Sequence, residues 1–244
     1  KVEGERERKG FCSSFDVVVV VFVDVKMRVM LLRYLFVAAV ASGVKVRRPA
    51  PSWEGSAVMP DGSFETLKSS DFTGKWLVLF FYPLDFTFVC PTEIRAYSEA
   101  YTTELKAMGA EVVGVSVDSK FSHLAWTKTD RADGGVGELA IPLVADITKD
   151  IAEAYGVLAD DDDDLAGVAM RGTFVVDPEG LLRAYTVHDE PLGRSVEETV
   201  RAVKGLQYAD SHQGEGCPAN WEQDSPTIKA NPKDSLDFFK QWAS

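Results

Sequence analysis

The hydrophobic pattern of the chain changes at about residue 49. Before that point stand two apolar stretches, residues 17–23 and 29–41, and neither reaches the ~20 residues that a membrane-spanning helix needs. After it, short apolar runs of strand length alternate with segments in which apolar residues recur at helical spacing. This alternation predicts an α/β domain built around a central sheet.

The most apolar run marks the first buried strand of that domain. Residues 76–82 read WLVLFFY, as expected for a strand that is covered on both faces, and Pro83 ends it. A helix is predicted from Pro91 to Met108, because proline is tolerated at a first helical position and apolar residues follow at helical spacing. Gly109 is the stop signal of this helix.

The later elements continue the alternation. We predict strands at 111–116 and 142–145, helices at 123–128 and 149–155, a hairpin of 173–177 and 182–187, a helix that Ser195 opens with Glu198 in a capping box, and an amphipathic stretch at 235–242. The hairpin turns at Asp177-Pro178-Glu179-Gly180.

Composition excludes some classes of function. With 45% hydrophobic residues the chain can bury a core, and 26 basic against 38 acidic residues give a net charge of -12. A strongly acidic protein repels polyanions, so a nucleic-acid-binding role is excluded. The run Asp160–Asp164 is predicted to be a solvated loop and not a calcium site, because it lacks the glycine and the distal glutamate of a binding loop.

The cysteines indicate redox chemistry more than structure. Cys12, Cys90 and Cys217 are too few and too scattered for a disulfide scaffold or a zinc cluster, because the chain has no C-x-x-C pair. The three histidines, His123, His188 and His212, are also far apart in sequence. We therefore expect neither a metal nor a cofactor.

Residues 1–46 are predicted to be a leader that is separate from the fold. Read from Met27, the segment has basic residues, an apolar centre and Ala39-Val40-Ala41, the layout of a secretory signal peptide. The absence of acidic residues from Met27 to Trp53 fits an organelle transit peptide almost as well, and a disordered or misassigned leader is the third interpretation. We expect one domain at 47–209 and a tail at 210–244 that carries Cys217.

Cys90 is the candidate nucleophile. It stands directly before Pro91 at the predicted helix start, where unpaired N–H groups and the helix dipole stabilise a thiolate. The alternative is a buried structural cysteine, and the position between strand and helix favours the reactive one. Thr87 is near enough to turn toward the sulfur, or serves only the turn. Arg171 could bring a permanent positive charge, or form a surface salt bridge.

A resemblance to a known family rests on four stretches of sequence. FFYPLDFTFVCPTE, from Phe80 to Glu93, closely resembles the active-site motif of the typical two-cysteine peroxiredoxins, with its P-x-x-x-T-x-x-C core at Pro83, Thr87 and Cys90. Three more stretches occur in the family's order: VVGVSVDSKFSHLAW at 112–126, RGTFVVDPEG at 171–180 and EGCPANW at 215–221. The resemblance covers the chain from about Arg47 to its end.

This resemblance implies a fold and a reaction. The fold would be thioredoxin-like, a central mixed sheet flanked by helices, with a C-terminal extension. The activity would be a thioredoxin-dependent peroxidase that reduces hydrogen peroxide and alkyl hydroperoxides, in antioxidant defence and cell redox homeostasis. Cys90, the peroxidatic cysteine, would become a sulfenic acid. Cys217 of a partner subunit would resolve it as an intersubunit disulfide, which thioredoxin reduces.

The resemblance also implies roles for the other site residues. Pro83 would shield the pocket, Thr87 and Arg171 would hydrogen-bond the peroxide oxygens, Arg171 would support the thiolate, and Glu93 would orient the arginine. The assembly would be a homodimer, associating into a decamer. The cytoplasm would be the place of action, with the secretory pathway or an organelle as alternatives that the leader at 27–48 offers.

Some features leave alternatives open. Gly134-Gly135-Val136-Gly137 and Phe238-Phe239 are variants of the GGLG and YF elements that mark family members sensitive to overoxidation, so we expect partial sensitivity. A holdase chaperone or redox relay is a second function of another class, whereas a disulfide reductase is disfavoured because Cys90 begins no C-x-x-C pair. His123 and Trp126 are interpreted as packing residues.

Overall fold

The computed structural model describes residues 43–243, which belong to one compact unit. The two apolar stretches of the predicted leader, and Cys12 with them, lie outside the described residues. Within 43–243 each helix is too short or too polar to cross a lipid bilayer. The same range holds no group of three or more His, Cys, Asp or Glu side chains placed to bind a metal ion.

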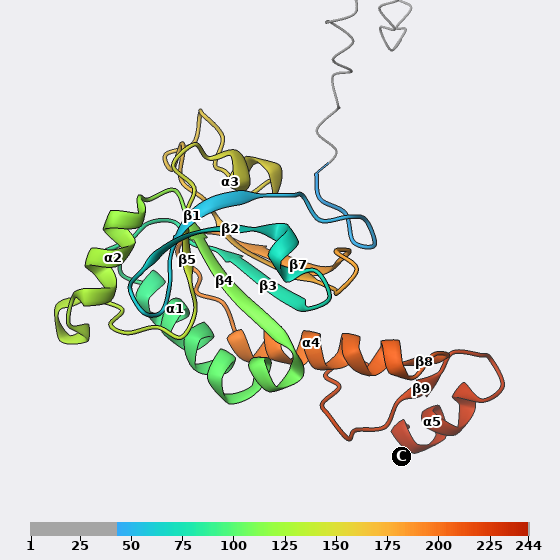
Figure 1. Ribbon diagram of the computed structural model, residues 1–244. Helices are drawn as coiled ribbons and strands as arrows, with labels where there is room; N and C mark the ends of the chain where they lie inside the picture. Colours follow the sequence, from blue (N-terminus) through green and yellow to red (C-terminus); the bar gives the residue numbers. More distant parts are fainter. Residues whose placement is uncertain (1–42, 244) are drawn as a thin grey trace, which may run out of the picture. The chain divides into compact units, whose positions relative to one another are not determined.

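A seven-stranded mixed sheet forms the centre of the fold (Figure 1), in the order β2-β1-β5-β4-β3-β6-β7. Strands β3, β4 and β5 run parallel, whereas β1, β2, β6 and β7 join their neighbours antiparallel. The bounds are β1 Glu54–Val58, β2 Phe64–Lys68, β3 Trp76–Phe81, β4 Ala110–Ser116, β5 Leu143–Ala145, β6 Arg171–Val176 and β7 Leu182–His188. This is the mixed sheet that the resemblance implied.

Helices cover both faces of the sheet. One face carries α1, Cys90–Ala100, with α2, Lys120–Lys128, and α4, Val196–Ser211, and the other carries α3, Asp150–Ala154. The tail then forms a small two-stranded sheet of β8, Glu215–Gly216, and β9, Ile228–Lys229, followed by α5, Ser235–Trp242. α4 runs two residues past the predicted end of the domain at 209, so the tail begins as the last turn of this helix.

The predicted elements are confirmed with three corrections. The helix expected to run to Met108 changes character after Ala100, where a π-helical stretch, Tyr101–Leu105, and a 3₁₀ turn, Lys106–Met108, lead to Gly109 at a φ of 70°. Only one of the two hydrogen bonds of the predicted capping box forms. Ser195 accepts a hydrogen bond from the Glu198 amide, but the Glu198 carboxylate pairs with Arg201. Strands β1 and β2 were not predicted.

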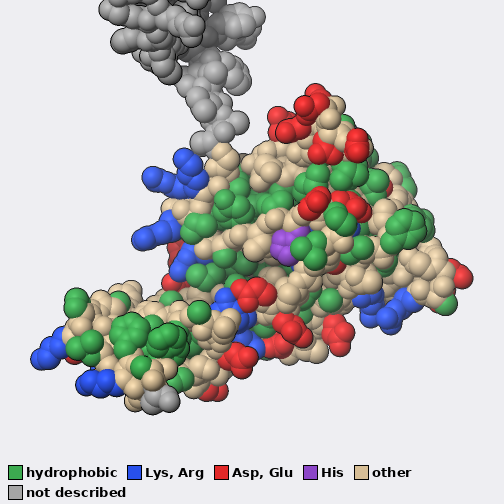
Figure 2. All heavy atoms as spheres, turned by 180° about the vertical axis from the view of Figure 1, so that it is seen from behind, with side chains coloured by type: hydrophobic (Ala, Val, Ile, Leu, Met, Phe, Trp, Pro, Cys, Tyr) green, Lys and Arg blue, Asp and Glu red, His purple; other side chains and the backbone are tan. Residues whose placement is uncertain are grey.

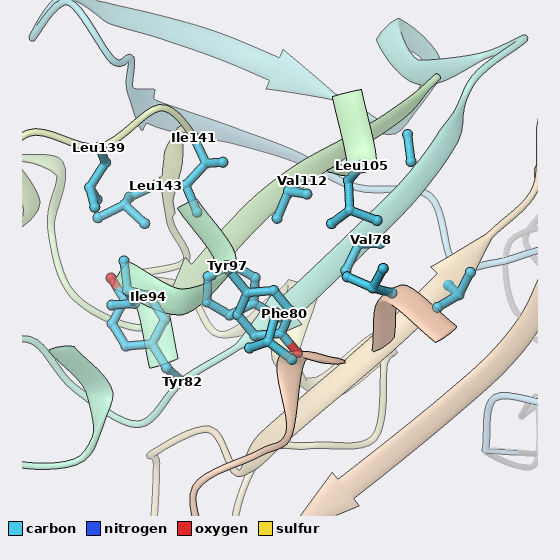
Figure 3. Close-up of a cluster of buried hydrophobic side chains, with 14 of the residues drawn as sticks. Val78, Phe80, Tyr82, Ile94, Tyr97, Leu105, Val112, Leu139, Ile141 and Leu143 are labelled. Atoms are coloured by element: carbon cyan, nitrogen blue, oxygen red, sulfur yellow. The ribbon is translucent and has the colours of Figure 1, made fainter. Parts of the chain in front are cut away.

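The core explains why β3 reads as an unbroken apolar run. All six of its residues are buried, with Val78 and Phe80 on one face of the sheet and Leu77, Leu79 and Phe81 on the other. Phe80 stacks on Tyr97 of α1 at 4.3 Å between ring centroids (Figure 3). A strand packed on both faces fixes the start of the loop that follows it, and that loop leads to Cys90.

Candidate active site

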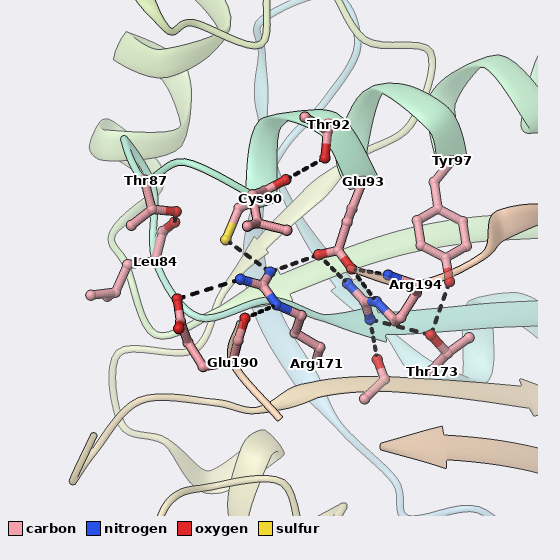
Figure 4. A network of polar contacts seen from close by, with 12 residues as sticks. Leu84, Thr87, Cys90, Thr92, Glu93, Tyr97, Arg171, Thr173, Glu190 and Arg194 are labelled. Atoms are coloured by element: carbon pink, nitrogen blue, oxygen red, sulfur yellow. Dashed lines mark hydrogen bonds and ion pairs between the residues drawn. The ribbon is translucent and has the colours of Figure 1, made fainter. Parts of the chain in front are cut away.

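Cys90 is the first residue of α1 and is fully buried. Its Sγ lies 3.3 Å from Nη1 of Arg171, which is the first residue of β6 (Figure 4). Pro91 occupies the second helical position, where its missing N–H costs no intrahelical hydrogen bond. The structure thus brings together the predicted nucleophile and the predicted cation, from positions 81 residues apart.

Arg171 is held by several acceptors at once. Nη1 also donates to Oε2 of Glu93 at 2.8 Å, and Nε donates to the Glu190 backbone carbonyl at 2.6 Å. A buried cation is tolerated only when it is paired and hydrogen-bonded, and these contacts meet that condition. Burial would lower the pKa of Arg171, but its contacts with Cys90 and Glu93 outweigh burial and raise it. The guanidinium therefore stays charged beside the sulfur.

Glu93 lies one helical turn after Cys90 and serves two arginines. Its side chain is 1% exposed and also meets Arg194, whose Nε lies 2.8 Å from Oε1 and whose Nη2 lies 2.9 Å from Oε2. Burial would raise the pKa of Glu93, but the hydrogen bonds and charge of Arg194, with a smaller contribution from Arg171, hold it below its usual value. The predicted orienting role of Glu93 has the contacts it needs.

Arg194 is the residue that sequence reasoning missed. It precedes the helix cap Ser195, and its backbone N–H donates to Glu93 as well. Its Nη1 donates to the Gly172 carbonyl at 2.7 Å, and its guanidinium lies over the Phe80 and Tyr97 rings at 5.4 and 5.6 Å. Nothing in the local pattern marks it, since its partner is 101 positions away.

The loop of residues 83–89 connects β3 to Cys90. Pro83 is buried, and the Thr87 hydroxyl donates to the Leu84 carbonyl at 2.8 Å, which leaves its acceptor lone pairs for a ligand. Phe86 adopts a φ of 55°, a left-handed conformation that is unusual for an aromatic residue. Phe88 is 92% exposed. The loop is therefore ordered at its base and open at its tip.

A buried polar cluster anchors this loop. His123 Nδ1 lies 2.8 Å from Asp85 Oδ2, and His123 Nε2 lies 3.2 Å from the Val144 carbonyl oxygen. The Asp85 backbone N–H donates to Asp118 at 2.8 Å, and the Tyr82 hydroxyl donates to Asp85 at 2.9 Å. Burial, and then the charge of Asp85, raise the pKa of Asp118. His123 thus makes structural hydrogen bonds, as its interpretation as a packing residue expects.

Cys217 lies elsewhere on the chain. It directly follows β8, and its Sγ lies 3.6 Å from the carbonyl oxygen of Gly205 on α4. Gly205 is ten residues past Ser195, which is about 15 Å along the helix axis. Within one chain, Cys217 therefore lies apart from the cluster around Cys90 and Glu93.

The arrangement at Cys90 suits a nucleophile that attacks a small polar molecule. A buried sulfur has one guanidinium donor in contact and a threonine hydroxyl in the adjoining loop, and both can hydrogen-bond a ligand in a site that excludes water. The polar groups of the site are cations, a carboxylate and hydroxyls. Such groups suit a substrate in which the electrophilic atom is already present.

Comparison with protein families identifies two matching regions. Residues 46–185 match the AhpC/TSA family, and residues 205–240 match the C-terminal domain of 1-Cys peroxiredoxin. The first match spans Pro83, Cys90 and Arg171, whereas the second spans Cys217. Both cysteines thus lie in regions that the family models cover, whereas Glu190 and Arg194 lie between the two regions.

Similar proteins cover nearly the whole described chain. Peroxiredoxin-2 of Rattus norvegicus is 52% identical over 202 residues, 82% of this chain and 98% of the rat protein. The mitochondrial thioredoxin-dependent peroxide reductase of Drosophila melanogaster is 50% identical over 211 residues, 86% of this chain and 87% of its own. The reduced 2-Cys peroxiredoxin of Plasmodium vivax superposes with a TM-score of 0.75 at 38% identity, over 80% of this chain and 98% of the other.

Proposed function

The chain belongs to the AhpC/TSA family as a peroxiredoxin, an antioxidant peroxidase, and on that premise we propose that Cys90 is its peroxidatic cysteine and Cys217 its resolving cysteine. The observation that carries the proposal is the contact between the buried Cys90 sulfur and Nη1 of Arg171 at 3.3 Å. A guanidinium at that distance favours the thiolate, which is the reactive form of a cysteine.

The first step consumes the peroxide. The Cys90 thiolate attacks the terminal oxygen of a hydroperoxide, an S–O bond forms and the O–O bond breaks. The leaving alkoxide or hydroxide takes a proton and departs as alcohol or water. Sulfur loses two electrons to the peroxide and becomes a sulfenic acid. Arg171 would donate to the peroxide oxygens. Thr87 would accept a hydrogen bond from the peroxide O–H, because its own hydroxyl donates to the Leu84 carbonyl. Pro83 would keep water out, and Glu93 would hold Arg171 in position.

The second step joins two chains. The thiol of Cys217 attacks the sulfenic sulfur, an S–S bond forms and water leaves. The Cα atoms of a disulfide lie within about 7 Å of each other, whereas the Cys217 sulfur lies about 15 Å along α4 from the cap beside the Cys90 site. This offset supports a disulfide to a partner subunit. Both segments have to unfold locally before the sulfurs meet.

Exposed apolar residues support a homodimer that assembles further into a decamer. β7 is the edge strand of the sheet, and its Tyr185 and Val187 are exposed. Leu236, Phe239 and Trp242 of α5 are exposed as well, and Figure 2 shows hydrophobic side chains gathered on that part of the surface. Hydrogen peroxide and alkyl hydroperoxides are the proposed substrates, with thioredoxin as the reductant of the disulfide, as the name of the Drosophila relative suggests.

Non-reducing electrophoresis after peroxide treatment tests both cysteines. The parent protein should give a covalent dimer, while Cys217→Ser should stay monomeric in the gel and still consume one equivalent of peroxide per subunit. Cys90→Ser should neither form the dimer nor consume peroxide. A dimer that persists in Cys217→Ser would overturn the resolving role, and peroxide turnover by Cys90→Ser would overturn the peroxidatic one.

For the place of action we propose the cytoplasm, with the secretory pathway or an organelle as the alternatives. The acid-free stretch from Met27 to Trp53 and the mitochondrial name of the Drosophila relative support the organelle. Fusing residues 1–48 to a fluorescent protein separates the cytoplasm from these alternatives, because a diffuse signal excludes targeting by this segment and a punctate or organellar signal excludes the cytoplasm.

A further inference from the structure

Glu190 lies beside the active-site arginine, although the reaction described above gives it no part. It follows β7 in the turn that leads to α4. Its backbone carbonyl accepts the Nε hydrogen bond of Arg171 at 2.6 Å, and its carboxylate Oε1 lies 3.6 Å from Nη2. Figure 4 shows the guanidinium between Cys90 and Glu190. Glu190 is therefore an immediate neighbour of the group that binds peroxide.

Each nitrogen of the Arg171 guanidinium contacts different partners. Nη1 serves Cys90 and Glu93, and Nε is taken by the Glu190 carbonyl. Nη2 faces the Glu190 carboxylate at an ion-pair separation that is longer than a hydrogen bond. The Arg171 side chain is 1% exposed whereas that of Glu190 is 41% exposed, so this carboxylate stands on the solvent side of the guanidinium.

The charges of the cluster show what Glu190 adds. The guanidinium groups of Arg171 and Arg194 are balanced by the Glu93 carboxylate and, in the reactive state, by the Cys90 thiolate. These four charges cancel. The carboxylate of Glu190 therefore leaves the cluster with one excess negative charge, and that charge lies at its exposed edge.

Resting on the function proposed above, we propose that Glu190 is a specificity-determining residue, which makes the site favour uncharged hydroperoxides over peroxides that carry a negative charge beside the O–O bond. An anionic peroxide meets the field of Glu190 and has to compete with its carboxylate for Nη2. An uncharged peroxide meets no such repulsion. Two like charges about 7 Å apart at an effective dielectric constant of about 40 to 80 change a rate by about threefold to sevenfold.

Rate constants for two small peroxides test this role. Hydrogen peroxide is uncharged, and peroxymonosulfate carries a negative charge next to its O–O bond at neutral pH. We would measure the second-order loss of the Cys90 thiol by rapid quench and alkylation in a full-length Cys12→Ser, Cys217→Ser background. Glu190→Gln should raise the ratio of the peroxymonosulfate to the hydrogen peroxide rate constant by about threefold to sevenfold, and the gain should shrink as salt is added.

Two further variants separate charge from structure. Glu190→Asp keeps the charge and should keep the parent's ratio, while Glu197→Gln makes the same change in net charge on the exposed first turn of α4 and should leave the ratio unchanged. An unaltered ratio in Glu190→Gln, an equal gain for both peroxides, or the same gain in Glu197→Gln overturns the proposal. Failure of the background protein itself to react at Cys90 would instead refute the proposed function.

Discussion

The two cysteines of the proposed reaction lie in opposite surroundings. Cys90 is fully buried at the end of a loop that follows the buried strand β3, and its sulfur meets a guanidinium that three further contacts hold in place. Cys217 is partly buried, on a tail whose strands are two residues long, and its thiol donates a weak S–H···O hydrogen bond to the Gly205 carbonyl at 3.6 Å. The Cys90 sulfur is positioned by buried elements of the domain, whereas the Cys217 sulfur is positioned by a tail that can detach from α4.

The electrostatic surroundings differ in the same direction. The Cys90 sulfur accepts a hydrogen bond at 3.3 Å from the Arg171 guanidinium, a permanent cation. Burial raises the pKa of Cys217, and the Glu215 carboxylate raises it further against the opposing charge of Arg201. A cation thus contacts the sulfur that has to attack the peroxide. The raised pKa keeps Cys217 in the thiol form, which reacts with peroxide more slowly than a thiolate does.

Removing the centre of the Cys90 site should have the largest effect. Glu93→Gln takes away the buried carboxylate that pairs with both Arg171 and Arg194, and so leaves Arg194 without its ion-pair partner and Arg171 with a weaker one. We expect the free energy of unfolding to fall by about 3 to 5 kcal/mol. Because Arg171 loses its position, the second-order rate constant with hydrogen peroxide should fall by about a hundredfold.

Urea unfolding and rapid-quench kinetics would measure these two quantities. Glu198→Gln is the matched control, because its carboxylate pairs with Arg201 at the surface and should contribute only about 0 to 1 kcal/mol. If Glu93→Gln unfolded at the same urea concentration as the parent, the buried ion-pair network would not be what holds this site.

The same contrast explains which parts could be predicted from the sequence. β3 was predictable because burial on both faces makes it apolar without interruption, and Cys90 because a strand, a loop and Pro91 mark the helix start. β2 was missed because four of its five residues are exposed, so FETLK shows no core face. Arg194 was missed because its role comes from Glu93 across 101 positions, which leaves no local pattern.

The tail shows the same limit. α5 was predicted at 235–242 from its amphipathic pattern, as the structure has it. The contacts that hold Cys217 were not predictable, because β8 and β9 are too short to carry a periodicity and Trp221 packs on Tyr208 of α4. Pairings between distant segments are decided by tertiary packing, which neither spacing nor composition records.

Loosening the tail should have the second largest effect. Trp221 is 2% exposed, its ring lies 5.1 Å from that of Tyr208, and its Nε1 donates to the Ser225 carbonyl. Removing a buried tryptophan side chain typically costs about 3 to 5 kcal/mol. In this chain the lost free energy weakens the packing of the tail on α4. Trp221→Ala should therefore speed amide hydrogen exchange at residues 215–229 by at least about tenfold, while β3 and β4 stay protected.

Trp242→Ala is the control for that change, because Trp242 is 77% exposed on α5 and should leave the exchange rates of 215–229 alone. Equal exchange in Trp221→Ala and the parent would mean that Trp221 does not hold the tail. The proposed difference between a fixed Cys90 and a mobile Cys217 would then have to rest on other contacts of the tail.

The smallest expected effect concerns the reactivity of Cys217 with pH. Only the thiolate is alkylated by iodoacetamide, so a raised pKa moves the rise in alkylation rate to higher pH than for an ordinary cysteine. Glu215→Gln removes a neighbouring negative charge and should move the rise to lower pH, whereas Arg201→Gln should move it to higher pH. Because both groups are partly exposed, each shift should change the rate at neutral pH by only about twofold to threefold. The measurement uses a Cys12→Ser, Cys90→Ser background, and an unchanged pH dependence in both variants would show that burial alone sets the pKa of this thiol.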